Sequence, residues 1–309
     1  MKKGVIHFQD RLFKWVTWLF ALVILGLSAG LLYQLAASSR PSFRTFGFHF
    51  LISRDWDPVK QLFGALPFIW GTLFSATIAL LIALPVSLGI AIFLTELSPG
   101  WLRKPVSLII ELLAAIPSVI YGIWGLFVLA PALQHFGQPF LAKYLGFLPF
   151  FRGYPLGVGM LAAGIILAIM ITPTISSISR EVLATVPDHQ KEAGLALGMT
   201  RWEVIRKVMI PYGRSGVAGA VLLGYGRALG ETMAVAMVIG NTSSLSLSLF
   251  QPGYTIAGVI ANEFPDATYQ LHISSLAELG FILFVITLSI NILARLLLRK
   301  MKRFELASG

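Results

Sequence analysis

Two opposite charges interrupt one long apolar stretch of this sequence. Arg227 and Glu231 belong to the run GRALGETM, residues 226–233, inside the apolar segment 216–240. An arginine near the middle of a bilayer costs about 2.5–3.5 kcal/mol on insertion scales, so a polar partner or a hydrophilic path has to offset it. Because they are four residues apart, the two side chains are expected to share one helix face.

Two interpretations of this pair follow from the residue types. In the first, the charges neutralise each other or a neighbouring helix. In the second, they line a hydrophilic path, where the planar guanidinium of Arg227 offers donors suited to an oxyanion. Glu231 would repel a fully deprotonated anion but accept a hydrogen bond from one that keeps a proton. Phosphate retains an O–H near neutral pH and sulfate does not, so the pair suits phosphate, with sulfate or molybdate as the alternative cargo.

The composition indicates a polytopic membrane protein. Of the 309 residues, 56% are apolar and only 12% are charged, far from the balance of a water-soluble chain. The net charge of +10 fits topology signals and contact with lipid head groups, and no nucleic-acid partner is expected. The absence of cysteine excludes disulfides and thiol nucleophiles, and the five scattered histidines show no metal-ligand spacing. No metal site and no catalytic residue are predicted.

Six stretches are long and apolar enough to cross a bilayer as helices. The predicted fold is an all-α membrane bundle of six transmembrane helices, kinked at Pro85, Pro117, Pro131 and Pro173. Residues 1–67 are interpreted as an N-terminal segment with the first span and an external loop, 68–298 as the main transmembrane domain, and 299–309 as a tail. The predicted spans are 15–37, 68–95, 106–133, 156–179, 216–240 and 276–298.

Basic residues predict which side of the membrane each loop faces. The N-terminus, the tail and the loops after the second and fourth spans carry 17 Lys and Arg, against six on the opposite side. Since the excess stays in the cytoplasm, both termini are expected to be cytoplasmic. The first span exceeds the length of an ordinary signal-peptide core, so it is expected to be retained instead of cleaved.

The cytoplasmic loop 180–215 is the most polar segment and reads as two short helices. The first is expected to open at Pro187 and to stop at Gly198. The second opens with a capping box of Thr200 and Glu203, and Pro211 is expected to end it. Each helix carries a short apolar stripe, which suits either packing under the bundle or docking to another protein. The stripes are Ala193, Ala196 and Leu197 in the first helix and Trp202, Ile205 and Val208 in the second.

Residues 192–211, EAGLALGMTRWEVIRKVMIP, resemble the EAA loop of ABC importer permeases. That pattern is E-A-A, three residues, G, nine residues and I-x-L-P. Glu192, Ala193, Gly198 and Pro211 match it in type and spacing, whereas Gly194 replaces the third alanine. The resemblance implies a coupling helix that docks on a separate ATPase subunit, where ATP and Mg would bind. No G-x-x-x-x-G-K-[ST] phosphate loop occurs in this chain, so it is expected to bind no cofactor itself.

The run 226–235, with IPSVIYGIWG at 116–125, resembles the PstC family of phosphate-specific ABC importer permeases. The likeness extends from about residue 68 onward and is weakest in the first 65 residues. It implies the six-helix, MetI-like permease fold of type I importers in a bacterial inner membrane. It also implies a homologous permease partner (PstA), two copies of an ATPase (PstB) and a periplasmic phosphate-binding protein (PstS). The roles proposed for the family's Arg and Glu carry over to Arg227 and Glu231.

Other polar groups in the spans give weaker signals. Pro117 cannot donate to the Leu113 carbonyl, so Ser118 and Tyr121 beside it are candidates for lining the substrate path, although a simple kink is the alternative. Glu111 and Glu278 are expected to reach an interface and receive no role. An ion-driven carrier acting alone and a membrane enzyme are the rival classes, and no clustered nucleophile, base or metal ligand supports the enzyme.

Overall fold

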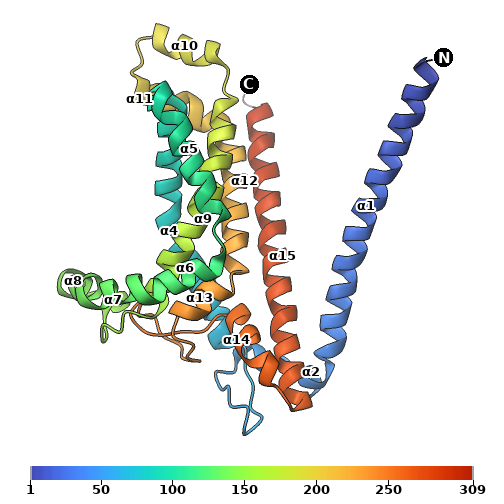
Figure 1. Cartoon of the computed structure of the whole chain (residues 1–309), viewed down its shortest axis with the longest axis vertical. Helices are drawn as coiled ribbons and strands as arrows, with labels where there is room; N and C mark the ends of the chain where they lie inside the picture. The colour runs from blue at the N-terminus through green and yellow to red at the C-terminus, as the bar shows by residue number, and fades with distance from the viewer. Residues whose placement is uncertain (1, 308–309) are drawn as a thin grey trace.

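The computed structural model describes residues 2–307, and within them every regular element is a helix. Five helical stretches are long and apolar enough to cross a membrane, namely 10–38, 66–97, 118–145, 160–184 and 270–296. A helix occupies all or part of each predicted span, and in Figure 1 these helices run along the bundle except the first, which leans away from it. These are α1 (Lys2–Ser38), α4 (Leu66–Ile92), α5 (Gly100–Ala115), α9 (Met160–Ala184), α12 (Ile210–Leu229) and α15 (Gln270–Ala307).

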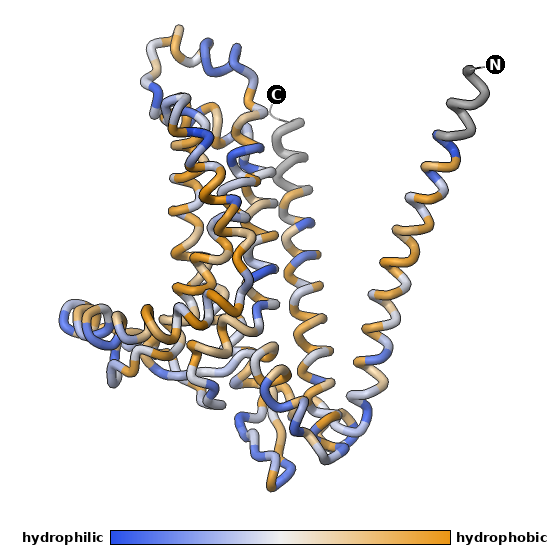
Figure 2. The backbone as a smooth tube through the Cα atoms, viewed as in Figure 1, coloured by the Kyte–Doolittle hydropathy of each residue, from blue (hydrophilic) through white to orange (hydrophobic). Residues whose placement is uncertain are grey.

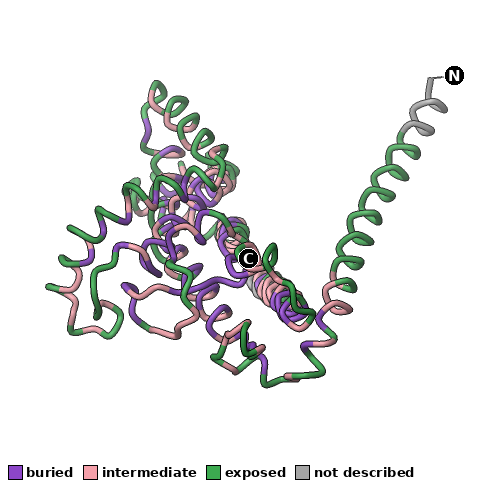
Figure 3. The backbone as a smooth tube through the Cα atoms, turned by 60° about the horizontal axis from the view of Figure 1, so that its bottom comes forward, coloured by how far each residue is buried: buried purple, intermediate pink, exposed green. Residues whose placement is uncertain are grey.

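The α9 helix forms the centre of the bundle. It packs against α4 on one side and α12 on another, and its Ile166, Ile171 and Ile175 are fully buried. Close approach to α4 depends on a small residue, because a Cβ at Gly164 would lie 2.4 Å from the Ile78 side chain. Burial is concentrated in this bundle, whereas α1 is exposed along most of its length (Figure 3). The exposed α1 is also largely apolar (Figure 2), as expected for a helix surrounded by lipid or by other membrane helices.

The prediction of one span over 106–133 is wrong, because the chain turns at Pro117. The α5 helix ends at Ala115, and Ile116 and Pro117 adopt extended conformations. A second helical stretch then runs sideways from the end of α5 (Figure 1). It consists of α6 (Ser118–Trp124), η2 (Gly125–Leu129), α7 (Ala130–Ala132), η3 (Leu133–Gly137) and α8 (Gln138–Leu145). The proline ring disfavours the helical conformation for the residue before it, which favours a turn at this position.

The prediction of an unbroken fifth span over 216–240 is also wrong. The α12 helix ends at Leu229, and a new helix, α13 (Met233–Val238), begins three residues after Gly230. Pro211 does not end the preceding short helix either. The chain continues from α11 (Arg201–Val204) through a π-helical segment, η5 (Ile205–Met209), directly into α12. The helix tolerates Pro211 because this residue lies in the first turn of α12, directly after the wide π turn, where a backbone N–H has no necessary partner.

The other prolines have smaller effects than expected. Pro85 and Pro173 lie inside α4 and α9 without breaking them, and Pro131 falls in the first turn of α7, where its missing N–H is not needed. Of the four prolines predicted to kink the bundle, only Pro117 changes the direction of the chain.

The two ends of the bundle have different characters. The start of α1, the end of α15 and helix α10 (Asp188–Ala196) lie at the same end (Figure 1), which agrees with the predicted grouping of both termini with the loop 180–215. The opposite end holds an aromatic cluster in which Trp56 packs edge-on against Phe63 and Phe68. It contains α2 (Arg40–Phe46), α3 (His49–Ile52), α14 (Ile256–Glu263) and η6 (Phe264–Asp266), while η4 (Pro149–Phe151) lies in the loop before α9.

We predict that Gly71→Ala destabilises the protein. A Cβ at Gly71 would lie 2.1 Å from the backbone oxygen of Tyr254, which cannot move as a side-chain tip would. Overpacking of this kind costs about 1–3 kcal/mol, more than the roughly 1 kcal/mol that alanine gains over glycine in a helix. Thermal unfolding in detergent should show a lower midpoint. Gly219→Ala is the control, because nothing lies within 4 Å of its Cβ, and an equal loss in both variants would contradict the prediction.

Candidate functional site: a broken helix and a cytoplasmic helix pair

Arg227 lies in the last turn of α12 and is exposed on the isolated chain. Its Nη1 donates to the Thr174 hydroxyl of α9 at 3.2 Å. The carbonyl groups at the end of α12 favour a cation at this position. None of the ion pairs among the described residues involves Arg227.

Glu231 lies in the break between α12 and α13 and is half-buried. Its Oε1 accepts a hydrogen bond from the Ala234 backbone N–H at 3.3 Å, at the start of α13. The expected shared helix face with Arg227 is therefore wrong, because α12 ends before Glu231. Gly230, the residue after the last helical one, was the available signal for this break.

The break brings the two charges to the ends of two different helices. The C-terminal end of α12 carries the cation, and the N-terminal end of α13 carries the anion, which is the favourable arrangement for both helix dipoles. Irregular backbone at membrane depth is stable where protein buries it or where it lines a water-filled cavity. No ion pair joins Arg227 to Glu231 among the described residues, and a hydrophilic path at this break stays a prediction.

Two polar residues close to Pro117, Tyr121 and Ser118, were predicted to line the substrate path. The hydroxyl of Tyr121 donates to the Leu113 carbonyl at 2.8 Å, so it satisfies the carbonyl that Pro117 leaves without a partner. Tyr121 is buried. Ser118 opens α6 and is half-buried, and its place on the path stays a prediction. Sequence reasoning missed Thr174, whose only signal was its position beside Pro173.

The helix pair of the loop 180–215 forms largely as expected. α10 follows Pro187, and Gly198 has φ +82°, the left-handed conformation that ends a helix. Both halves of the capping box are present. The Thr200 N–H donates to Glu203 Oε2 at 3.0 Å, and the Glu203 N–H donates to Thr200 Oγ1 at 3.3 Å. The Lys207 ammonium and then the Thr200 N–H lower the pKa of Glu203 to about 2, so this carboxylate is ionised at neutral pH.

The apolar side chains of this helix pair divide between packing and exposure: Val204 and Ile205 belong to a buried cluster with Leu183 of α9, and others are exposed. Leu197 is 79% exposed and Trp202 is 59% exposed, and Ala193 and Ala196 are exposed too, whereas Ile205 is buried. Gly194 is the point of closest approach between the two helices, since a Cβ there would lie 3.1 Å from Val204. Of the two readings left open by the sequence, docking to another protein therefore accounts better for these exposed side chains.

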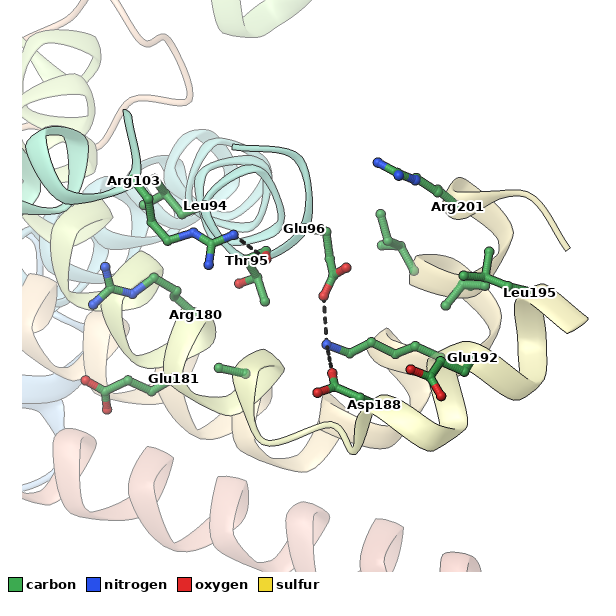
Figure 4. A pocket seen from close by; sticks show the side chains of 14 residues that line it. Leu94, Thr95, Glu96, Arg103, Arg180, Glu181, Asp188, Glu192, Leu195 and Arg201 are labelled. Carbon is green, nitrogen blue, oxygen red and sulfur yellow. Dashed lines mark hydrogen bonds and ion pairs between the residues drawn. The ribbon is translucent and has the colours of Figure 1, made fainter. Parts of the chain in front are cut away.

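A polar cleft of about 780 Å³ separates α10 from the ends of α9 and of η1 (Phe93–Leu97), the π-helical continuation of α4 (Figure 4). Glu192 and Arg201 line it together with Arg103, Arg180 and Glu181. Lys191 spans the cleft, with its ammonium 2.9 Å from Glu96 Oε1 and 3.3 Å from Asp188 Oδ1. Burial opposes the charge of Lys191, but the bonds to Glu96 and Asp188 outweigh it and raise the pKa. This ion pair, which joins α10 to the second span, was not predicted.

Comparison with known proteins places this geometry in a family. A family model described as "Binding-protein-dependent transport system inner membrane component" matches residues 83–303. The chain belongs to this family. It is accordingly a multi-pass inner-membrane protein, and the matched region includes the broken helix and the helix pair but not α1.

Similar whole proteins cover almost the entire chain. A Haemophilus influenzae protein named "Phosphate transport system permease protein PstC" is 52% identical over 95% of this chain and 94% of its own length. A Mesorhizobium japonicum protein of the same name is 51% identical over 94% of this chain and 90% of its own.

Solved structures show the same fold. A subunit of the MetNI methionine ABC transporter, in an inward-facing conformation, matches with a TM-score of 0.58 at 18% identity, over 80% of this chain and 99% of its own. A bacterial ABC transporter for alginate matches with a TM-score of 0.59 at 18% identity, over 92% and 98%. The predicted ABC permease fold is thus confirmed.

We predict that Thr200→Ala loosens the start of α11. Loss of an N-cap costs about 1 kcal/mol, so the amide of Glu203, which Thr200 holds, should exchange with deuterium roughly fivefold faster. Hydrogen exchange measured by mass spectrometry on peptides covering 200–209 tests this. Thr185→Ala is the control, because the Thr185 hydroxyl donates to the Val182 carbonyl at the end of α9 and not to α11. Unchanged exchange in Thr200→Ala would show that the cap is not what holds this turn.

Proposed function

We propose that this chain is a transmembrane subunit of an ATP-driven importer that carries inorganic phosphate from the periplasm to the cytoplasm. The observation that carries the proposal is Arg227, an exposed guanidinium at a helix break that has no carboxylate partner among the described residues. The names of the relatives from Haemophilus influenzae and Mesorhizobium japonicum support the choice of phosphate.

The chemistry of the break fits a partly protonated oxyanion. Arg227 uses one nitrogen for Thr174, and its other donors are available for a phosphate oxygen. Glu231 uses Oε1 for the Ala234 N–H, which leaves Oε2 to accept the O–H that phosphate keeps near neutral pH. A substrate shifts a transporter between states only through contacts that differ between those states, and these two side chains are the contacts we assign. Ser118 completes the path in this proposal.

The machine that moves the substrate requires other subunits. A homologous permease partner (PstA) would enclose the path, since Arg227 lies on the surface of this chain. The exposed Leu197 and Trp202 of the helix pair would dock on one of two copies of a separate ATPase (PstB), which binds ATP and Mg. A periplasmic phosphate-binding protein (PstS) would deliver the substrate at the opposite end. The Lys191 bridge then gives docking a direct mechanical connection to the second span.

We predict that Arg227→Leu lowers phosphate uptake by 10- to 100-fold, because a hydrogen bond to a charged group contributes about 1.5–3 kcal/mol. Arg227→Lys should retain part of the activity, since it keeps the charge and loses the planar fork. The measurement is labelled phosphate uptake by cells that express the complete complex, with sulfate and molybdate as competitors. Co-purification of the other subunits must first show equal assembly.

Arg44→Leu is the matched control for this experiment. Arg44 is an exposed arginine in α2, at the end of the bundle away from α10, and its removal should leave uptake unchanged. Ordinary uptake by an assembled Arg227→Leu complex would overturn the proposal. Preferred competition by sulfate or molybdate would replace phosphate with that oxyanion, and transport by this chain alone in proteoliposomes would favour an ion-driven carrier.

We predict that Glu231→Gln weakens the preference for phosphate over sulfate. Glutamine still presents a carbonyl oxygen, but it loses the negative charge that repels a fully deprotonated anion, so sulfate should compete more effectively with phosphate. The measurement is the ratio of inhibition constants of sulfate and phosphate in the same uptake assay. An unchanged ratio would remove Glu231 from substrate selection while leaving the role of Arg227 intact.

A further inference from the structure

An apolar groove of about 640 Å³ lies at the end of the bundle that is distant from α10, between α2, α4 and α15. Phe43, Phe48 and Leu51 line one side, and Leu73, Phe281 and Val285 line the other. Several of these side chains are exposed, Phe48 to 78%. Because α4 and α15 are membrane-spanning, an apolar groove on their outer surface faces acyl chains.

One wall of this groove contains a carboxyl group that the sequence gave no role. Glu278 of α15 lines the groove, is only 5% exposed, and has an Oε2 atom with no hydrogen-bond partner. The Ser42 side chain is the hydrogen-bonding group beside this carboxyl. The Ser42 hydroxyl is shared with Ser275 at 3.1 Å, and the Ser42 N–H donates to Ser274 at 2.8 Å. The local hydroxyl groups therefore leave one carboxyl oxygen unsatisfied, which is costly in an apolar setting.

A cation lies on the same groove. Arg40 begins α2, lines the groove and is exposed. Among the described residues, no ion pair involves Arg40 or Glu278. The groove is thus lined by a guanidinium and by a buried carboxyl group, with no ion pair between them among the described residues, beside a surface that suits hydrocarbon.

We propose that this groove binds a single phospholipid whose head group carries a primary ammonium, phosphatidylethanolamine. Its acyl chains would lie along Phe43, Phe281 and Val285, its phosphate would meet Arg40, and its ammonium would donate to Glu278. Charge complementarity selects this lipid. Phosphatidylcholine has a cation without N–H donors, and phosphatidylglycerol offers only neutral hydroxyl donors, so neither gives Glu278 a hydrogen bond from a cationic donor. The inference concerns a site separate from the substrate path.

The test is native mass spectrometry of the purified full-length protein with its subunits, in detergent that contains equal amounts of the three lipids with matched acyl chains. Wild type should retain phosphatidylethanolamine over phosphatidylcholine by about tenfold, as expected for one charge-assisted hydrogen bond. Glu278→Leu should lower this ratio to near one, and Glu278→Gln should lower it substantially. Arg40→Gln should reduce the retention of all three lipids, because each carries a phosphate.

Glu111→Gln is the matched control, since Glu111 is an exposed glutamate of another membrane helix, α5, and it should keep the wild-type preference. A second measurement covers variants that assemble poorly: phosphatidylethanolamine should raise the thermal midpoint of wild type more than phosphatidylcholine does, and this difference should be much smaller in Glu278→Gln. Equal retention of the two lipids by wild type, a preference for phosphatidylglycerol, or an unchanged preference in Glu278→Gln would each overturn the proposal. Phosphate uptake is not part of the readout, so the result is independent of the proposed substrate.

Discussion

The structure depends on one constraint of the bilayer: a polar group that leaves water must find a partner inside the protein or a path that contains water. Tyr121 meets this constraint locally by donating to the Leu113 carbonyl that Pro117 leaves free. The break at Gly230 meets it by placing Arg227 and Glu231 at helix ends whose dipoles favour their charges. Among the described residues Arg227 donates to Thr174, and in the function proposed here its remaining donors bind the substrate at the break.

Short-range sequence motifs were sufficient to predict the helix pair 188–209. The Thr200–Glu203 box, the opening at Pro187 and the terminator Gly198 depend on backbone groups at most three residues away, so the sequence contains all the partners. The exposure of Leu197 and Trp202 did not follow from the sequence, because the same apolar stripe is expected for packing against the bundle and for docking on another protein.

The errors occurred where distant segments decide the outcome. A proline is compatible with a continuous helix, as at Pro173, and with a sharp turn, as at Pro117; the difference lies in how Tyr121 and the packing of α6 on α13 stabilise the turned conformation. Similarly, Arg227 and Glu231 have the spacing of a helical pair, and only the end of α12 at Leu229 separates them. Glu278 has the sequence environment of an interfacial residue, yet α2 folds over it and leaves it buried.

The exposed surfaces of the isolated chain indicate how the substrate path is completed. α5 buries none of its residues, and Arg227 is exposed although it lies within a membrane helix. An exposed guanidinium facing lipid would cost several kcal/mol, so this face is stable only against water or protein. A second permease placed there would cover Arg227, enclose water between the two subunits and leave each half of the path incomplete alone. In the proposed function, the lack of a carboxylate partner for Arg227 among the described residues has the same basis: a permanent ion pair would occupy the donors that would have to bind and release an anion in each cycle.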